Sequence, residues 1–271
     1  MGHAHARQAG DGETAVIHEI FSGIQGEGVL VGLRQIFVRF HGCNLDCAFC
    51  DTPASQGTAP ELCAIEQQAG SRTLSYARNP LSVSTVREAL GRLQVGYAHH
   101  AVSLTGGEPL LHVPFLNALL PALHDDHLHS MLETNGTLAG AFTLLARTPD
   151  YIAMDIKLPS ATGLAPQWAA HSAFLQEAVA RLLPAGVRAL RDRLQVKLVF
   201  SEDSLRDVLQ ASELMAACHP DIPCILQPLT PHTGGPPTPC AATVLEAQRL
   251  AARVLSDVRV IPQTHVRLGQ W

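Results

Sequence analysis

Short apolar runs separated by amphipathic stretches recur along the chain, and they predict alternating strands and helices. Most of the runs are apolar throughout, as expected for parallel strands buried on both faces. They cover residues 35–41, 101–104, 130–133, 151–155, 195–200, 224–227 and 258–261. Such alternation forms a parallel sheet with right-handed crossovers, either closed as a (β/α) barrel or open as a doubly wound sheet.

Helical patterns fall between these runs. Thr85 and Glu88 form a capping box that predicts a helix over residues 86–93, and Pro114 suits the first turn of a helix running to about residue 123. The remaining helices are expected at residues 142–146, 174–183, 203–217 and 241–255.

Two stretches, residues 53–80 and 159–171, match neither pattern. The first is long and loop-like, and we interpret it as an insertion, because loops of that length are usually functional or inserted. We find no domain linker. We therefore expect a flexible leader over residues 1–18 and a single domain over residues 19–271.

Composition narrows the class of protein. The 271 residues are 46% hydrophobic with a formal net charge of −5, which excludes a disordered chain and gives no electrostatic footprint for nucleic acid. No run approaches the roughly 20 apolar residues of a membrane span, and the N-terminus lacks a signal pattern. We expect a cytoplasmic protein, in which seven cysteines indicate metal binding or catalysis more than disulfides.

Polar residues gather just after the predicted strand ends. They occupy residues 42–52, 105–109, 134–136, 156–157, 228–230 and 262–265. Ligands bind outside the carboxyl ends of parallel strands, in barrels and in open sheets alike. These six loops therefore predict one site on one face of the sheet.

The first of these loops holds Cys43, Cys47 and Cys50 in a C-x3-C-x2-C spacing. An iron–sulfur cube normally takes four cysteines, so three would leave one iron open to another ligand. Three other interpretations remain at this point. They are a zinc site that recruits His41, a redox pair of Cys47 and Cys50, and three structural cysteines.

The cysteine spacing, with Phe49 before the last cysteine, and the segment at residues 106–109 (GGEP) resemble the radical S-adenosylmethionine superfamily. Six segments narrow the resemblance to the 7-carboxy-7-deazaguanine synthases. They are residues 19–28, 37–40, 42–52, 104–110, 133–137 and 262–265. The matches run from residue 19 to the end of the chain. The resemblance implies an α/β fold, a partial (β/α) barrel of about six parallel strands.

The resemblance also implies cofactors. The three cysteines would ligate one [4Fe-4S] cluster, S-adenosylmethionine would chelate its open iron, and Thr52 would supply a hydroxyl to Mg²⁺. From the residues alone, a loop-capping role for Thr52 fits as well. The residues marked for S-adenosylmethionine are Phe49, Asp51, Gly107, Glu108, Asp155, Ile156, Lys157, Gln227, Pro228, Leu229 and Thr230. Many members of the family have Ser-Pro-Lys where this chain has residues 155–157, and only Lys157 matches that form here.

For the substrate, the resemblance implies a pterin pocket with a clamp for a carboxylate. Arg39 would grip the substrate carboxylate, although from the strand pattern alone an outward-facing or internally paired Arg39 is the simpler interpretation. Thr105 would add a hydrogen bond, and the terminal carboxylate of Trp271 would reach the substrate. The other residues of the pocket would be Ile24, Gln25, Gly26, Glu27 and His265.

The activity implied is conversion of 6-carboxy-5,6,7,8-tetrahydropterin to 7-carboxy-7-deazaguanine with loss of ammonia, a step toward queuosine. An adenosyl radical would abstract hydrogen at C6, and the ring contraction would depend on Mg²⁺. The expected partners are a flavodoxin-like electron donor and a second copy of the chain. Two alternatives remain: a radical enzyme that activates a glycyl-radical enzyme, and a zinc-binding structural module.

Overall fold

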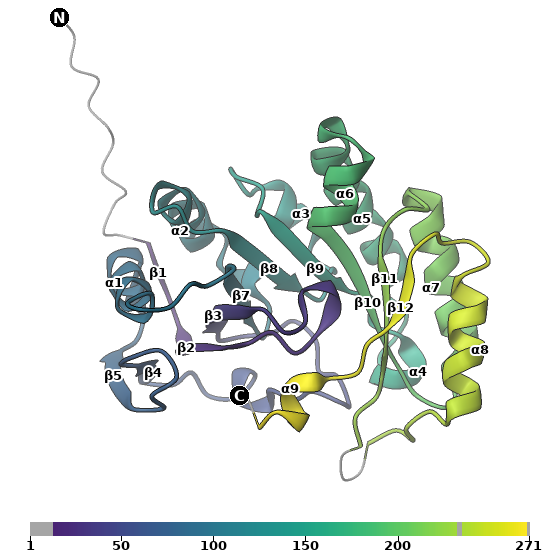
Figure 1. The fold of residues 1–271 in the computed structure, drawn as a ribbon, viewed down its shortest axis with the longest axis horizontal. Coiled ribbons are helices and arrows are strands. Elements are labelled where there is room, and N and C mark those ends of the chain that lie inside the picture. The colour runs from purple at the N-terminus through teal and green to yellow at the C-terminus, as the bar shows by residue number, and fades with distance from the viewer. Residues whose placement is uncertain (1–12, 232–234, 270–271) are drawn as a thin grey trace, which may run out of the picture.

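A computed structural model describes residues 13–231 and 235–269, and its main feature is a ten-stranded sheet (Figure 1). The strand order is β12-β11-β10-β9-β8-β7-β3-β2-β4-β5. The strands are β2 (Ile17–Ile24), β3 (Arg34–Phe40), β4 (Leu62–Glu66), β5 (Leu74–Arg78), β7 (Val102–Gly106), β8 (Ser130–Thr134), β9 (Tyr151–Asp155), β10 (Leu194–Phe200), β11 (Cys224–Pro228) and β12 (Val258–Val260).

The seven apolar runs all form strands, and they form the parallel part of the sheet. Strand β3 and strands β7 to β12 pair in parallel with one another, whereas β2 pairs with β3 antiparallel. Val196 and Leu198 of β10 are fully buried, as are equivalent positions in the other central strands. The two edges, β12 and β5, lie at opposite ends of the strand order. The expected partial barrel is therefore confirmed, with seven parallel strands where about six were predicted.

Helices follow the curve of the sheet along its outer side, from α1 to α8 (Figure 1). They are α1 (Val83–Leu93), α2 (Val113–Asp125), α3 (Ala139–Thr143), α4 (Pro159–Thr162), α5 (Trp168–Leu182), α6 (Val187–Arg193), α7 (Leu205–Cys218), α8 (Ala241–Ala251) and α9 (Thr264–Arg267). Within the described residues, no helix is both long and apolar enough to cross a membrane.

The helix boundaries correct two predictions. Helix α1 begins three residues before the expected position, because the hydroxyl of Ser82 accepts a hydrogen bond from the Thr85 amide at 3.2 Å and caps the helix. The prediction that Thr85 and Glu88 form a capping box was therefore wrong. The stretch at 159–171, expected to be irregular, contains α4 and the first turn of α5.

The interpretation of residues 53–80 as a loop was also wrong in part. Strands β4 and β5 form an antiparallel hairpin, and β4 pairs in parallel with β2. Cys63 and Ile65 of β4 lie in the hydrophobic core, which explains why the hairpin extends the sheet. A 3-10 turn over Pro53–Ser55 precedes it.

The leader predicted over residues 1–18 is too long, because ordered structure begins before residue 18. Strand β1 (Thr14–Ala15) pairs with β6 (Leu81–Ser82), and β2 begins at Ile17, whose side chain is fully buried. Burial of Ala15 and Ile17 holds this part of the chain on the sheet. Residues 1–12 of the leader lie outside the described residues.

Candidate active site

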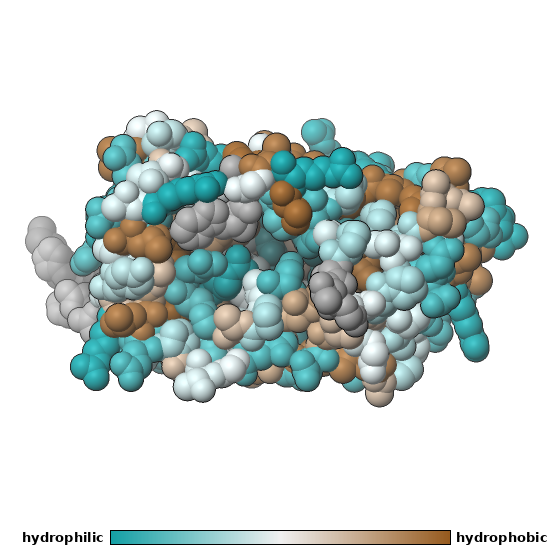
Figure 2. Space-filling view, turned by 90° about the horizontal axis from the view of Figure 1, so that it is seen from below, coloured by the Kyte–Doolittle hydropathy of each residue, from teal (hydrophilic) through white to brown (hydrophobic). Residues whose placement is uncertain are grey.

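A cavity of about 440 Å³ opens at the carboxyl ends of the parallel strands. Figure 2 looks onto this side and shows a hollow near the middle of the face, with hydrophilic residues around it. All six polar loops named above contribute to its lining. The strand topology therefore brings together residues that are far apart in the sequence.

The lining includes nearly every predicted site residue. The exceptions are Glu108, Ile156 and Pro228, while Trp271 lies outside the described residues. Ile156 is buried in the core, and its amide donates to the Lys197 carbonyl at 3.0 Å. A side-chain role for Ile156 or Pro228 toward a ligand therefore has no support from the geometry.

Backbone contacts fix the cysteine loop against the glycine segment that follows β7. The Gly107 amide donates to the Phe40 carbonyl at 3.2 Å, and the Glu108 amide donates to the Gly42 carbonyl at 2.7 Å. A Cβ atom at Gly107 would lie 2.0 Å from the Gly42 oxygen. This position requires glycine, because the two loops approach more closely than any side chain permits.

The three cysteines lie half-buried on the cavity wall, and their surroundings suit sulfur ligands. The amide nitrogens of Asn135 and Gln56 lie 3.9 Å from Cys43 Sγ and 3.7 Å from Cys50 Sγ. Such N–H donors stabilise the thiolates that hold an iron–sulfur cluster. Burial raises the pKa of Cys47 to about 11, and the positive charge of Lys157 acts in the opposite direction.

No group of three or more His, Cys, Asp or Glu side chains within the described residues gathers closely enough to hold a single metal ion. In an iron–sulfur cluster, by contrast, each cysteine binds a different iron, so the cysteines need not converge on one point. Three thiols from one loop and an open side toward the cavity fit that group.

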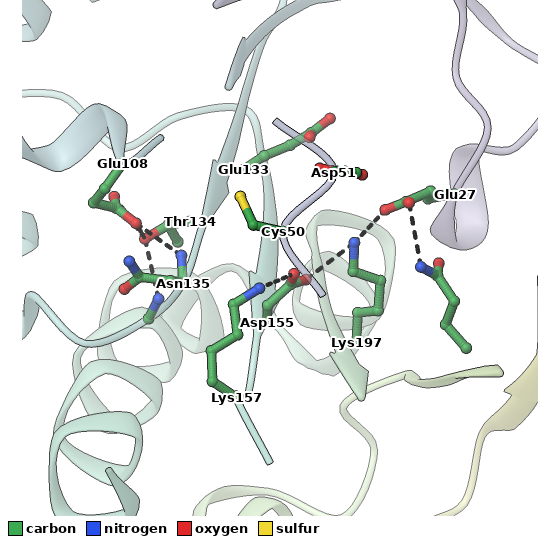
Figure 3. Close-up of polar contacts among 12 residues, drawn as sticks. Glu27, Cys50, Asp51, Glu108, Glu133, Thr134, Asn135, Asp155, Lys157 and Lys197 are labelled. Carbon is green, nitrogen blue, oxygen red and sulfur yellow. Dashed lines mark hydrogen bonds and ion pairs between the residues drawn. The ribbon is translucent and has the colours of Figure 1, made fainter. Parts of the chain in front are cut away.

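Glu108 lies beneath the cavity wall, and its carboxylate is fully used within the protein. It accepts hydrogen bonds from the Leu110 amide at 3.0 Å, the Asn135 amide at 2.8 Å and the Thr134 hydroxyl at 2.9 Å. Figure 3 shows this group turned toward the loop after β8. Burial raises the pKa of Glu108 to about 7 despite these bonds. A contact of Glu108 with S-adenosylmethionine stays a prediction.

Glu27 lies at the other end of the cavity, in the turn that follows β2. Its carboxylate pairs with the Lys197 ammonium and accepts hydrogen bonds from the amides of Gln263 at 2.7 Å and Gln227 at 3.2 Å. Burial works to raise the pKa of Glu27, but the charge of Lys197 prevails and lowers it to about 2. Gln227 Oε1 is buried without a hydrogen-bond partner within the described residues. A ligand that donates a hydrogen bond would satisfy it.

Arg39 pairs with Glu19 on the neighbouring strand, with 2.6 Å between Nε and Oε1. An internal ion pair, one of the two simpler interpretations from the sequence, is therefore present. Arg39 nevertheless lines the cavity, and its side chain is 18% exposed. Its substrate role stays a prediction.

The C-terminal segment packs onto the turn between β2 and β3. The Thr264 amide donates to the Gly26 carbonyl at 2.9 Å, and a Cβ at Gly26 would lie 2.2 Å from Nδ1 of His265. In addition, Arg72 of the β4–β5 hairpin donates to the Gly269 carbonyl at 2.8 Å. His265 therefore lies on the cavity wall beside the turn, and its contact with the substrate stays a prediction.

Thr52 begins the 3-10 turn after the cysteines, but its side chain makes no capping hydrogen bond there. Thr52 lines the cavity, and its hydroxyl lies 4.0 Å from Cys50 Sγ. The loop-capping alternative is therefore not supported, and the hydroxyl is available to a ligand.

Sequence reasoning missed several polar residues of the site, among them Ser55 and Gln56 after the cysteines. Glu133 of β8 accepts hydrogen bonds from Gln25 at 2.8 Å and Thr105 at 2.9 Å. Gln195 and Lys197 of β10 and Gln263 also line the cavity. The two on β10 carried a usable signal, because they are polar residues two apart in an apolar strand and must therefore share one face.

The fold and the cysteine loop define a class of enzyme. A sequence model of the Radical SAM superfamily matches residues 37–209, and the chain belongs to that superfamily. Two relatives are more specific. A protein of Geobacter sulfurreducens is 43% identical over 94% of this chain and 98% of its own, and one of Archaeoglobus fulgidus is 33% identical over 93% and 96%. Both are named 7-carboxy-7-deazaguanine synthase, and this chain belongs to their family.

Solved structures agree on the fold. QueE from Escherichia coli aligns with a TM-score of 0.55 at 21% identity, covering 91% of this chain and 93% of QueE. TYW1 with a lysine-pyruvate adduct aligns with a TM-score of 0.52 at 15% identity, covering 82% and 74%. Family membership supports the synthase over the glycyl-radical activase and the zinc module.

Proposed function

We propose that this enzyme converts 6-carboxy-5,6,7,8-tetrahydropterin to 7-carboxy-7-deazaguanine with release of ammonia, a step toward queuosine. One observation carries the proposal beyond family membership: a single cavity joins the cysteine loop to Glu27, Arg39 and His265. Radical chemistry requires that the cofactor and the reacting carbon share one space that excludes water.

The cofactors fit the residues at one end of this cavity. Cys43, Cys47 and Cys50 would hold a [4Fe-4S] cluster, and Gly107, Lys157 and Gln227 would lie against S-adenosylmethionine. When bound, these groups supply a 5′-deoxyadenosyl radical, and the difficult chemistry is theirs. The protein binds, orients and encloses them.

The substrate fits the other end. Only Nε of Arg39 bonds to Glu19 within the described residues, so its two terminal nitrogens remain for the substrate carboxylate. Glu27 would accept hydrogen bonds from the amino-pyrimidine edge, because a carboxylate offers more acceptor sites than its present partners use. Thr105 and His265 would add contacts from opposite sides.

Magnesium is the third expected group, and Thr52 is its proposed protein ligand. Mg²⁺ prefers oxygen ligands, retains water and commonly uses substrate oxygens. Thr52 lines the cavity and its hydroxyl makes no capping bond, which supports this role.

We further propose a homodimer in the cytoplasm that receives electrons from a flavodoxin-like protein. Leu62 and Tyr76, on the β4–β5 hairpin at the edge of the sheet, are 51% and 63% exposed. Exposed apolar residues at a sheet edge support an interface there. Sedimentation of the holoenzyme tests the dimer, and a monomer would contradict it.

The decisive experiment is anaerobic turnover of the carboxytetrahydropterin by reconstituted enzyme, with and without Mg²⁺. Mass spectrometry should detect the deazaguanine, and controls without S-adenosylmethionine should show none. Cys47→Ala is the matched control, since it removes one cluster ligand and should abolish product. Absence of product from wild-type enzyme with a full complement of iron and sulfide would reject the proposed substrate.

A further inference from the structure

The chain has just two lysines, Lys157 and Lys197, among its 19 basic side chains of Lys and Arg. Both lysines lie in the cavity lining, and all the other residues among these 19 are arginines. Arginine presents a planar fork, whereas lysine presents a compact ammonium on a flexible stem. A chain that uses arginine elsewhere has lysine at the two places where a small buried cation is needed.

The two lysines belong to one row of alternating charges, which Figure 3 shows. Lys197 lies between the carboxylates of Glu27 and Asp155, at 3.3 Å from Asp155 Oδ1. Asp155 Oδ2 in turn accepts from Lys157 at 2.8 Å. The Lys157 ammonium lies 5.5 Å from the centre of the Phe49 ring, in the cysteine loop. The row therefore connects the turn at Glu27 to the cysteine loop.

Strand β10 holds the same turn at a second point. The side-chain oxygen of Gln195 accepts from the Val29 amide at 2.6 Å. A Cβ at Gly28 would lie 2.2 Å from that oxygen, and the φ of Gly28 is +68°. Gln195 and Lys197 are two residues apart and face the same side, so one strand contacts the turn both at Glu27 and at Val29.

The charges near Glu27 come from several elements. Lys197 on β10 and His265 on α9 act on it directly, and both favour its anionic form. Asp155 on β9 and Glu133 on β8 act on Lys197 and keep it protonated. A lone carboxylate in this buried place would instead take up a proton, because burial penalises the charged form.

We propose that Lys197 is a positioning residue for the substrate: it holds Glu27 as an oriented anion and ties it to Asp155 on the cofactor side. This inference rests on the proposed function, because it assigns Glu27 to the pterin. It predicts that loss of the Lys197 charge leaves Glu27 protonated near neutral pH. Substrate affinity then rises with pH as Glu27 ionises, whereas wild-type affinity stays level.

The first test is calorimetric binding of the carboxytetrahydropterin to the holoenzyme between pH 6 and 9. Lys197→Met should weaken binding at least tenfold at pH 7, and part of the loss should be recovered at pH 9. Lys197→Arg keeps the charge and should show no such pH dependence. Arg188→Met is the matched control, because Arg188 is 94% exposed on α6 and its loss should change nothing. If Lys197→Met bound the substrate with wild-type affinity at every pH from 6 to 9, the proposal would be overturned.

Lys197→Met removes the cation that Glu27 and Asp155 share, and the unpaired charge could prevent folding. A second variant controls for this effect. Lys197→Met combined with Glu27→Gln keeps the row neutral. It should fold and should bind substrate weakly with no pH dependence. Retained pH dependence in this double variant would show that another group titrates, which would contradict the role of Glu27.

The second test does not need the substrate to be correct. Lysine labelled with ¹³C at Cε gives two side-chain signals in the holoenzyme, and Lys197→Met assigns them. The Lys197 signal should stay at its protonated position at pH 10.4, where a free lysine is half titrated. A signal that is half titrated there would refute the ion pair with Glu27. If the Lys197 signal stays at its protonated position but the wild-type enzyme forms no product, the proposed function is rejected and the ion pair of Lys197 with Glu27 is retained.

Discussion

The two ends of the cavity are built by different means. At the cysteine end, Gly107 and Gly42 bring two loops together through backbone hydrogen bonds with no space for a Cβ atom. At the Glu27 end, separate segments meet through side-chain charges, with Lys197 between two carboxylates. Both ends contain glycines with no space for a Cβ atom, but the clash is with backbone at the first end and with side chains at the second. Only the second end depends on a paired charge.

The largest expected effect is at the cysteine end. Gly107→Ala places a methyl group 2.0 Å from a backbone oxygen, so one of the two loops must move. We expect a loss of about 1–3 kcal/mol in stability from overpacking and, because the cysteines move with the loop, loss of the cluster and of turnover. Iron and sulfide analysis with the visible absorbance measures this.

Gly91→Ala is the control for that experiment. Gly91 lies inside α1, and within the described residues a Cβ there meets no atom of another segment within 4 Å. This substitution should stabilise the protein by about 1 kcal/mol, since alanine is the better helix former. Normal cluster content in Gly107→Ala would show that the close approach is not needed.

The next effect is at the substrate end. Arg39→Ala should raise the dissociation constant of the carboxytetrahydropterin roughly 10- to 100-fold, because a charge-assisted pair is lost. Calorimetry on the holoenzyme measures this. Glu19→Gln is the control: it removes the partner of Arg39 but keeps its fork, so binding should persist. Unchanged affinity in Arg39→Ala would disprove the carboxylate clamp.

A smaller effect is expected at Thr52, between the two ends. Thr52→Ala should lower turnover and weaken the response to added Mg²⁺. Water and substrate oxygens would still surround the ion, so the loss is partial. Thr52→Ser keeps the hydroxyl and should keep the response. A full Mg²⁺ response in Thr52→Ala argues against the ligand role.

The smallest effect concerns the pH dependence of the free energy of unfolding near the cysteine end. Burial raises the pKa of Glu108 to about 7, so the folded state holds an extra proton and stability falls as pH rises from 4.5 to 7. Burial lowers the pKa of His171 to about 4, so stability falls as pH drops from 6.5 to 4. Each is worth about 3 kcal/mol, and in the wild type they nearly cancel.

Two variants separate these opposing contributions. Urea unfolding of cluster-free Glu108→Gln should show a loss of stability on acidification, because His171 then acts alone. His171→Gln should show the reverse, a gain on acidification. Equal slopes in the two variants would mean that neither group titrates as its burial requires.

The parallel strands could be predicted because each is a continuous apolar run buried on both faces. Strand β2 was missed, since the sequence of Ile17–Ile24 (IHEIFSGI) includes polar residues and is not a continuous apolar run. Hairpin β4–β5 was missed because its strands are short and flanked by proline and glycine. Such edge strands depend on pairing with β2 more than on their own pattern.

The site shows the same division. The cysteine loop is local in sequence, so its spacing was sufficient to predict it. Lys197 acts through Glu27 and Asp155, which lie 170 and 42 positions away, and no local pattern indicates such a pairing. Glu108 was placed among the ligand residues by resemblance, and only the structure shows its oxygens bound by Thr134 and Asn135.

The hydrogen bond between Thr264 and Gly26 joins residues 238 positions apart. A ribosome adds about 5–20 residues per second, so the turn at Gly26 waits roughly 10 to 50 seconds for its partner. The cysteine loop and strand β10 are made well before that. The substrate end of the cavity is therefore the last part of the enzyme to form, and a chain released before residue 263 has its cysteines but lacks the segment that packs on the turn.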